Sequence, residues 1–349
     1  MRPIVRHGTP VDLEGSENQH LKDDLDRNRK PELRRSLFQL ANSVIPYLAL
    51  WGAMIWSLQV SYWLTLALSV LAAGFLVRIF IIFHDCGHGS FFKSSRANRI
   101  AEFFTGVMVL TPFRQWSRQH AQHHATSGDL DRRGFGDVWT MTTKEYLAAS
   151  RGERFGYHIN RNPFVLFVVA PIYVFFIRQR LPAKDVGPRE HRGLWMANAA
   201  IAAVAVTMGL LIGFKEYFMI QIPVMFFGGV AGIWLFYVQH QYENVYWARH
   251  DKWDYTTAAL QGSSFYMLPK VLQWFSGNIG FHHVHHLNSR IPNYKLEECH
   301  LSDPVFQDVT TLTLRSSFKS IGFRLWDEDG QRMTGYAPAR ALRRAAAAV

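Results

Sequence analysis

The sequence predicts an all-α integral membrane protein: four transmembrane helices with a cytoplasmic helical cap that holds a His-rich site for two metal ions. Three observations favour this fold class. Four apolar stretches reach the roughly 20 residues that a helix needs to cross a bilayer. Most basic residues lie outside the two short connectors that join these stretches in pairs. Half of the 16 histidines fall in three close clusters at the ends of apolar segments.

The four long apolar stretches cover residues 36–58, 62–83, 194–214 and 217–238. Two shorter apolar stretches are interpreted differently. Residues 101–113 are too few to cross and end at Pro112, which predicts an interfacial or re-entrant helix. Residues 163–177 are interrupted by Pro171, which favours an interfacial segment, with a further span as the alternative. The Gly- and Asp-rich residues 126–146 predict a structured loop.

Lys and Arg residues set the predicted orientation in the membrane. They concentrate in the N-terminal segment, the long middle stretch and the C-terminal third, with Lys215 and Arg78 as exceptions. By the positive-inside rule, both termini and the middle stretch lie on the cytoplasmic side, and so do all three histidine clusters. We therefore expect a multi-pass protein of the cytoplasmic membrane. On that side of the membrane, Cys86 and Cys299 are not expected to form a disulfide.

The charge of the chain predicts a lipid partner. The formal net charge is +11, and because the basic residues flank the spans, we interpret it as attraction to anionic lipid headgroups. The sequence contains no zinc-finger, RNA-binding or helix-turn-helix pattern, so nucleic acid is not an expected partner. Three parts are expected: a loose cytoplasmic tail over residues 1–30, a membrane domain over 31–335 and a basic C-terminal tail over 336–349.

The histidine clusters read HDCGH, HAQHH and HHVHH, and they contain His84, His88, His120, His123, His124, His282, His285 and His286. Helix positions three and four apart share a face, so each cluster directs its imidazoles to one point. Imidazole binds iron, copper and zinc, and one zinc ion is filled by about four ligands. Eight imidazoles therefore indicate two metal ions. Iron suits redox chemistry, which zinc lacks, while copper shares the same ligand preference.

The other histidines are interpreted separately. His240 ends the fourth span on the same side and is a candidate ninth ligand. His283 points to a different helix face from His282, so we expect it to support the ligands rather than to bind metal. The remaining six are expected to have no ligand role: His7, His20, His158, His191, His250 and His300.

Carboxylates near the clusters are candidates to orient the ligands. A metal-bound imidazole usually donates its second N–H to a carboxylate or carbonyl, which fixes the ring. The candidates are Asp85, Asp129, Asp131, Asp137 and Glu243, with a capping or surface role as the alternative for each. Arg78, near the end of its span, is expected to snorkel or to pair. No catalytic side chain is expected beyond the metal ligands.

Longer strings around these motifs resemble the membrane fatty acid desaturases, specifically the bacterial acyl-lipid type. The resemblance extends from about residue 35 to 329 and includes HDCGHGSFF, QHAQHHATSGDLDRRGFGDVWT, RNPFVLF, WLFYVQHQYE and GNIGFHHVHHLNSRIPNY. It implies four spans under a cytoplasmic cap with two irons, held here by the eight cluster histidines. It also implies a further ligand near the end of the fourth span, for which His240 is the match. The chain has no fused cytochrome domain or HPGG motif, so a separate electron donor is expected, by resemblance a ferredoxin.

The resemblance implies oxygen-dependent removal of two hydrogens from a membrane-lipid acyl chain, which leaves a cis double bond. A carotenoid hydroxylase or ketolase, or an alkane hydroxylase, would use the same metal site, and the long matching strings favour desaturation over these. A His-rich metal carrier is disfavoured because its ionisable groups would lie near the bilayer midplane. A purely structural membrane protein would leave the clusters unexplained. The position of the double bond and the group that carries the acyl chain stay open.

Overall fold

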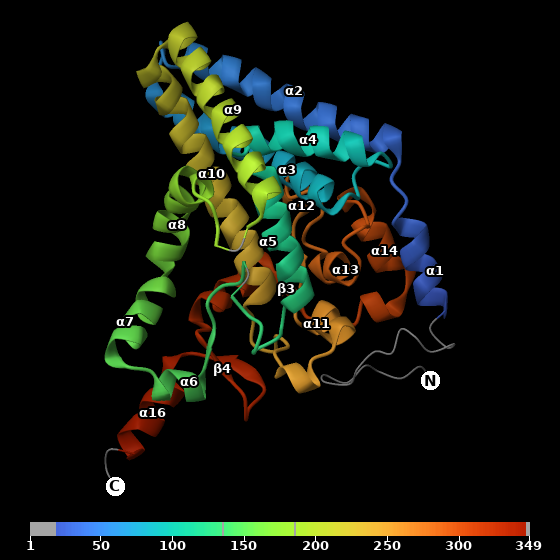
Figure 1. The fold of residues 1–349 in the computed structure, drawn as a ribbon, viewed down its shortest axis with the longest axis vertical. Helices are drawn as coiled ribbons and strands as arrows, with labels where there is room; N and C mark the ends of the chain where they lie inside the picture. Colours follow the sequence, from blue (N-terminus) through green and yellow to red (C-terminus); the bar gives the residue numbers. More distant parts are fainter. Residues whose placement is uncertain (1–18, 135, 185, 347–349) are drawn as a thin grey trace.

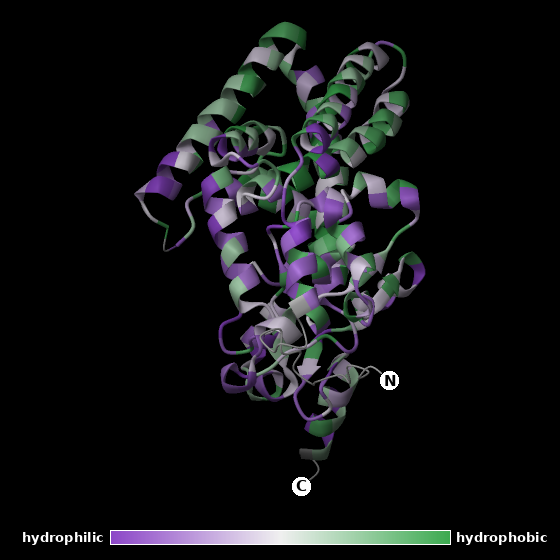
Figure 2. Ribbon diagram, turned by 90° about the vertical axis from the view of Figure 1, so that its right-hand side faces the viewer, coloured by the Kyte–Doolittle hydropathy of each residue, from purple (hydrophilic) through white to green (hydrophobic). Residues whose placement is uncertain are grey.

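The computed structural model describes residues 19–134, 136–184 and 186–346. Its four longest helices are α2 (Leu33–Ser57), α3 (Tyr62–His88), α9 (Pro188–Ile212) and α10 (Phe214–His240). All four are long and apolar enough to cross a membrane, which confirms the four predicted spans by length and composition. They gather at one end of the molecule (Figure 1), where hydrophobic residues predominate (Figure 2).

α3 is the central helix of this group. It contacts α2, α10, α4 (Ser95–Met108) and α5 (Phe113–Thr126). The helix ends at His88 because Gly89 adopts a left-handed conformation, with φ of 70°, that other residues rarely tolerate. α10 likewise ends at a histidine, His240. Two spans therefore each finish on a histidine, and their final turns point into the rest of the molecule.

The two shorter apolar stretches form less regular helices. The first gives α4, whose start is capped by the Ser94 hydroxyl and which ends ahead of Pro112. The second gives the π-helical and α-helical turns η2 (Val165–Val169), α8 (Ala170–Ile172) and η3 (Tyr173–Ile177), followed by η4 (Arg178–Arg180). This segment makes an angle of 55° with α7 (Arg151–Asn160), and the two together qualify as one bent span by length and composition. The interfacial interpretation and its alternative, a fifth span, both fit.

The remaining elements form a polar region, defined as residues 113–162 and 241–346, in which hydrophilic residues are more frequent (Figure 2). Within the predicted loop, the structure has short strand β1 (Met141–Thr142) and the start of α6 (Thr143–Ala148). The other elements of this region are η5 (His250–Lys252), α11 (Tyr255–Gln261), α12 (Lys270–Phe275), α13 (His282–Leu287), η6 (Asn293–Lys295), α14 (Leu296–Ser302), η7 (Pro304–Phe306), α15 (Leu314–Ser317), η8 (Phe318–Gly322) and α16 (Tyr336–Ala346).

The fold is mostly helical, but the described residues also form short strands, so the all-α prediction was too strict. β1 pairs in parallel with β4 (Leu325–Asp327), which pairs antiparallel with β5 (Arg332–Thr334). β2 (Phe265–Met267) pairs in parallel with β3 (Thr311–Thr313). Strands of two or three residues are too short to give the alternating pattern by which a strand is detected in sequence.

The N-terminal part corrects a second expectation. Gln19–Asn28 form helix α1, which docks on α14 through the buried side chains of Leu21 and Leu25. Two leucines four positions apart make one apolar stripe, which the surrounding charged residues hid in the sequence. This part of the expected loose tail is therefore an ordered helix, while residues 1–18 lie outside the described residues. The C-terminal tail likewise begins as a helix, α16, and residues 347–349 lie outside the described part.

Candidate metal centre

Four helices bring nine histidines together where the long helices meet the polar region. α3 contributes His84 and His88 from its final turns, and α10 contributes its last residue, His240. The other histidines come from α5, which packs on α3, and from the short α13. A bridge between Phe265 and Phe281 fixes the chain immediately before α13. The structure thus gathers in one place all nine histidines that the sequence singled out.

The first group contains five histidines whose ring nitrogens lie within 4.8 Å of one another: His84, His88, His120, His124 and His285. Within this group, Nε2 of His124 lies 3.2 Å from Nε2 of His120 and 3.0 Å from Nε2 of His285. A neutral imidazole carries only one proton, so these three nitrogens cannot all be satisfied by one another. A shared cation would satisfy them together.

The second group lies beside the first. His123, His240 and His286 have ring nitrogens within 4.8 Å of one another. Nε2 of His240 lies 3.3 Å from Nε2 of His123 and 2.9 Å from Nε2 of His282, so His282 completes a set of four. The α5 and α13 clusters each contribute to both groups, and the two groups are therefore close neighbours.

The buried ring nitrogens fit a metal better than they fit a protein core. Nε2 of His88 and Nε2 of His286 are buried and have no hydrogen-bond partner among the described residues. An unpaired buried polar atom costs about 1–3 kcal/mol, and bound metal removes that cost. Burial, with help from neighbouring histidines, also lowers the pKa values of His120, His124 and His285. These imidazoles are therefore neutral, which is the form that binds metal.

Two carboxylates orient one histidine in each group. Asp85 lies 3.0 Å from Nδ1 of His84, and Asp137 lies 2.6 Å from Nδ1 of His123. In addition, Nδ1 of His240 lies 3.1 Å from the carbonyl oxygen of Gly262. Each of these contacts directs Nε2 of the ring towards its group, as second-sphere partners of metal sites do. The structure has the contacts that were predicted for Asp85 and Asp137, and their role in orienting metal ligands stays a prediction.

The other three candidate carboxylates do not contact either group. Asp129 binds Arg132 and Nδ1 of His250, at 2.6 and 2.9 Å. Asp131 pairs with Arg249 at 2.8 Å. The side chain of Glu243 is exposed. Proximity to a cluster in the sequence therefore did not predict contact with a ligand, because the loop after α5 turns Asp129 and Asp131 towards the segment around His250.

Two further expectations concern residues next to the ligands. His283 points to another face of α13, as expected, but its Nε2 lies 3.1 Å from Nδ1 of His300 and not beside a candidate ligand, so this contact does not bear out the expected supporting role. Arg78 is paired, as expected: its guanidinium donates to the carbonyl oxygen of Trp274 and lies 4.0 Å from the centre of that indole ring. Neither residue belongs to the histidine groups.

Asn293 and Arg161 are supporting residues that the sequence reasoning missed. The backbone N–H and side-chain amide of Asn293 donate to Asp85 at 2.7 and 2.8 Å, and its Oδ1 accepts from Gln39 on α2 at 2.9 Å. The buried Arg161 donates to Gln241, the neighbour of His240, at 2.7 Å. Both residues lie within the long strings that carried the resemblance, and those strings were the only signal for them.

A large apolar cavity of about 500 Å³ reaches both histidine groups. His84, His120, His123 and His282 lie along its wall at one end. Away from the histidines, the walls come mainly from apolar side chains of α3 and α10 and from η3, including Leu76, Phe80, Val174, Met225 and Ile233. Gln115, Gln119, Arg178, Gln179 and Gln239 also line the cavity, but its wall is mostly apolar, so an apolar ligand could lie against the metal-binding face.

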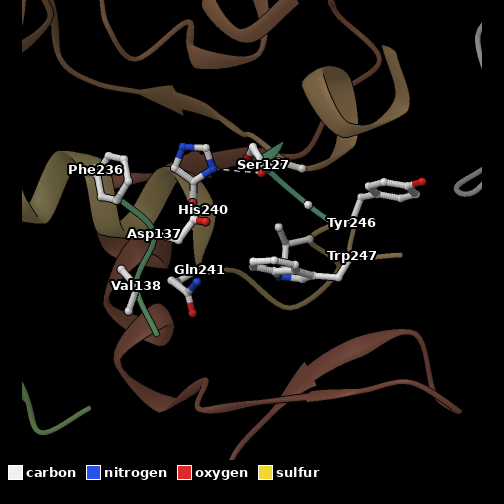
Figure 3. Close-up of a pocket in the computed structure, with 11 residues that line it drawn as sticks. Ser127, Asp137, Val138, Phe236, His240, Gln241, Tyr246 and Trp247 are labelled. Carbon is white, nitrogen blue, oxygen red and sulfur yellow. Dashed lines mark hydrogen bonds between the residues drawn. The ribbon is translucent and has the colours of Figure 1, made fainter. Parts of the chain in front are cut away.

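A second, much smaller cavity lies beside His240. Its volume is about 10 Å³, and Asp137, His240, Gln241 and Ser127 contribute polar atoms to its lining (Figure 3). This is the space of about one water molecule, and the polar lining offers the partners that such a water needs. The second histidine group is therefore bordered by a small pocket with polar and apolar lining, in addition to the large cavity.

Comparisons with known proteins show which family this chain is similar to. A profile of the family described as "Fatty acid desaturase" matches residues 61–311. The "Fatty acid desaturase" of Bacillus subtilis is 50% identical over 307 residues, covering 88% of this chain and 87% of that protein. The "sn-1 oleoyl-lipid 12-desaturase" of Anabaena variabilis is 26% identical over 259 residues, 70% of each chain. The "sn-1 acyl-lipid omega-3 desaturase (ferredoxin)" of Synechocystis is 27% identical over 233 residues, 62% of this chain and 61% of that protein.

Proposed function

This chain belongs to the fatty acid desaturase family, and from that premise we propose that it is a di-iron acyl-lipid desaturase that introduces a cis double bond into a membrane-lipid acyl chain. The observation that carries the proposal is the juxtaposition of two histidine groups with an apolar cavity of about 500 Å³. A cavity of this kind suits a hydrocarbon chain, and nine imidazoles suit two redox-active ions.

We assign the five-histidine group to one iron and the four-histidine group, with His240, to the other. When bound, the iron pair would supply oxygen-dependent oxidation of an unactivated C–H bond. Overall, one O2, two electrons and two protons combine with two hydrogens of the acyl chain to give a carbon–carbon double bond and two waters. The electrons come from a separate donor protein, and the printed name of the Synechocystis relative supports a ferredoxin in that role.

The protein's own side chains bind and orient. The apolar walls of the large cavity hold the acyl chain and exclude water, so that neighbouring carbons lie against the histidine face in a near-attack arrangement. Asp85 and Asp137 keep the Nδ1 protons of His84 and His123 in place, which leaves the Nε2 lone pairs free for the metals. The small pocket beside His240, with Ser127, Asp137 and Gln241 in its lining, offers a position for one water next to the second group.

The proposed location is the bacterial cytoplasmic membrane, with the metal centre and both termini on the cytoplasmic side. The distribution of Lys and Arg supports this orientation, because the short α9–α10 connection and the α2–α3 connection contain few basic residues. The orientation also gives a water-soluble electron donor access to the histidine side of the molecule.

Expression in a host that lacks desaturases and has defined lipids tests the proposal. Mass spectrometry of the lipids should show new cis-unsaturated acyl chains, formed only with oxygen. Hydroxylated or ketone products without unsaturation would contradict desaturation and favour a carotenoid or alkane hydroxylase, or a ketolase, which the names of the relatives do not favour. The same analysis locates the double bond.

A further inference from the structure

Three glycines of α10 lie on the wall of the large cavity: Gly228, Gly229 and Gly232. They are spaced so that they share one face of the helix. A glycine inside a helix costs about 1 kcal/mol relative to alanine, so each of these positions needs a reason. Close packing is the usual one, because a glycine lets a neighbouring element approach the helix backbone.

Close packing explains Gly228 and Gly229. A Cβ atom on Gly228 would lie 3.1 Å from Leu76 on α3. A Cβ atom on Gly229 would lie 3.0 Å from Pro171 and 3.1 Å from Phe175, in the segment that follows α7. All three distances are tighter than ordinary van der Waals contact, so these glycines let the walls of the cavity approach one another.

Gly232 has no such neighbour. A Cβ atom there would meet no atom within 4 Å, and the open space that it would enter is the large cavity. His282, whose Nδ1 is buried and has no partner among the described residues, lines the same cavity. A mostly apolar cavity that is lined by the candidate metal ligands and by a helix backbone without a side chain at residue 232 can hold a long apolar ligand.

We propose that Gly232 determines the acyl-chain length that this protein accepts, an inference that rests on the proposed desaturase function. Gly232 precedes His240 by eight residues, which is about 12 Å along the helix axis. Leu76 and Val77 on α3 and Met225 on α10 also line the cavity, and these apolar side chains suit the methyl end of a chain. The missing side chain at residue 232 leaves the passage open to that end.

The test compares G232A and G232L with G52L. Gly52 is a matched control because it also lies within a long apolar helix, α2, and a Cβ there would meet nothing within 4 Å, yet it is exposed and does not line the cavity. Each variant is expressed in the desaturase-free host, which is supplied with palmitate or stearate. The measured quantity is the ratio of unsaturated stearoyl to unsaturated palmitoyl product.

G232L should lower this ratio about ten-fold, because the two methylene groups by which stearate exceeds palmitate lose their burial. G232A should give a smaller shift in the same direction, and G52L should leave the ratio unchanged. The proposal would be overturned if G232L gave the same product ratio as the wild-type protein, or if G52L shifted the ratio as much as G232L does. An equal loss of both products would also contradict it, provided that G232A shows no shift.

A second measurement does not depend on activity. Radiolabelled palmitate and stearate are bound to purified protein in detergent, and G232L should weaken stearate binding relative to palmitate binding, while G52L should not. If the wild-type protein forms no double bond but the binding ratio shifts as expected, the proposed function fails and the role of Gly232 stands. If double bonds form and neither ratio shifts, the function stands and the role of Gly232 fails.

Discussion

Replacing Asp85 with asparagine should weaken the first histidine group selectively. In the wild-type protein, one carboxylate oxygen of Asp85 lies 3.0 Å from Nδ1 of His84, and the other accepts two N–H groups from Asn293. An asparagine at residue 85 keeps one acceptor oxygen and places an NH2 group at the other position. That group would meet N–H donors on whichever side it faces, so at least one buried donor loses its acceptor.

The expected magnitude follows from these contacts. Leaving a buried N–H unpaired costs about 1–3 kcal/mol, and loss of a partner that orients a metal ligand typically lowers metal affinity by about 10- to 100-fold. We therefore expect Asp85→Asn to lower iron affinity at the five-histidine group by this factor. The second group has its own carboxylate, Asp137, and should keep its affinity.

Chelator competition on purified protein measures this effect, with total bound iron counted at each chelator concentration. Asp129→Asn is a matched control, because Asp129 is also buried and accepts from a histidine, His250, that belongs to neither group. The reasoning is refuted if Asp85→Asn binds both irons as tightly as the wild type, or if Asp129→Asn weakens binding equally.

Three further predictions concern the ligands, their protonation and their support. Replacing His123 or His285 with alanine should abolish double-bond formation while the protein still inserts into the membrane, whereas His191→Ala should leave activity nearly unchanged. Lipid mass spectrometry measures the product, and full activity of either ligand variant would contradict the ligand assignment. Burial lowers the pKa values of His120, His124, His285 and His286, so the unfolded chain binds more protons than the folded one just below pH 6.5. Thermal unfolding of metal-free protein should therefore show stability that is complete above about pH 6.5 and falls as the pH drops, and a melting temperature that rises on acidification would contradict this sign. Asn293→Ala should lower iron affinity in the same direction as Asp85→Asn, by about 1 kcal/mol for each lost hydrogen bond, and equal affinities of variant and wild type in the chelator assay would remove Asn293 from the support of the site.

The spans and the gathering of histidines could be predicted from the sequence because both depend on local patterns. Apolar runs of sufficient length gave the four long helices, and helical spacing placed each cluster on one face. The division between the two groups could not be predicted. On α5, His120 and His124 belong to one group while His123, three residues after His120, belongs to the other. The spacing predicts that the histidines of one cluster lie close together. Which group each histidine joins depends on where α3, α10 and α13 lie.

Several contacts that support the ligands join residues far apart in the sequence, so they too could not be predicted from local patterns. Asp85 lies within a histidine cluster and contacts its neighbour His84, whereas Asp129 follows a cluster and contacts His250 instead. Asn293, which donates to Asp85, comes from a segment 208 residues away. The docking of α1 and the pairing of the short strands are similarly long-range. These features have no periodic signal, so the sequence alone could not place them.

Metal analysis of the purified chain tests the central claim most directly. Two groups, one of five and one of four imidazoles, should hold two irons per chain that remain bound through purification. Protein that is folded in detergent and still takes up only one ion, or none, when iron is supplied would contradict the account.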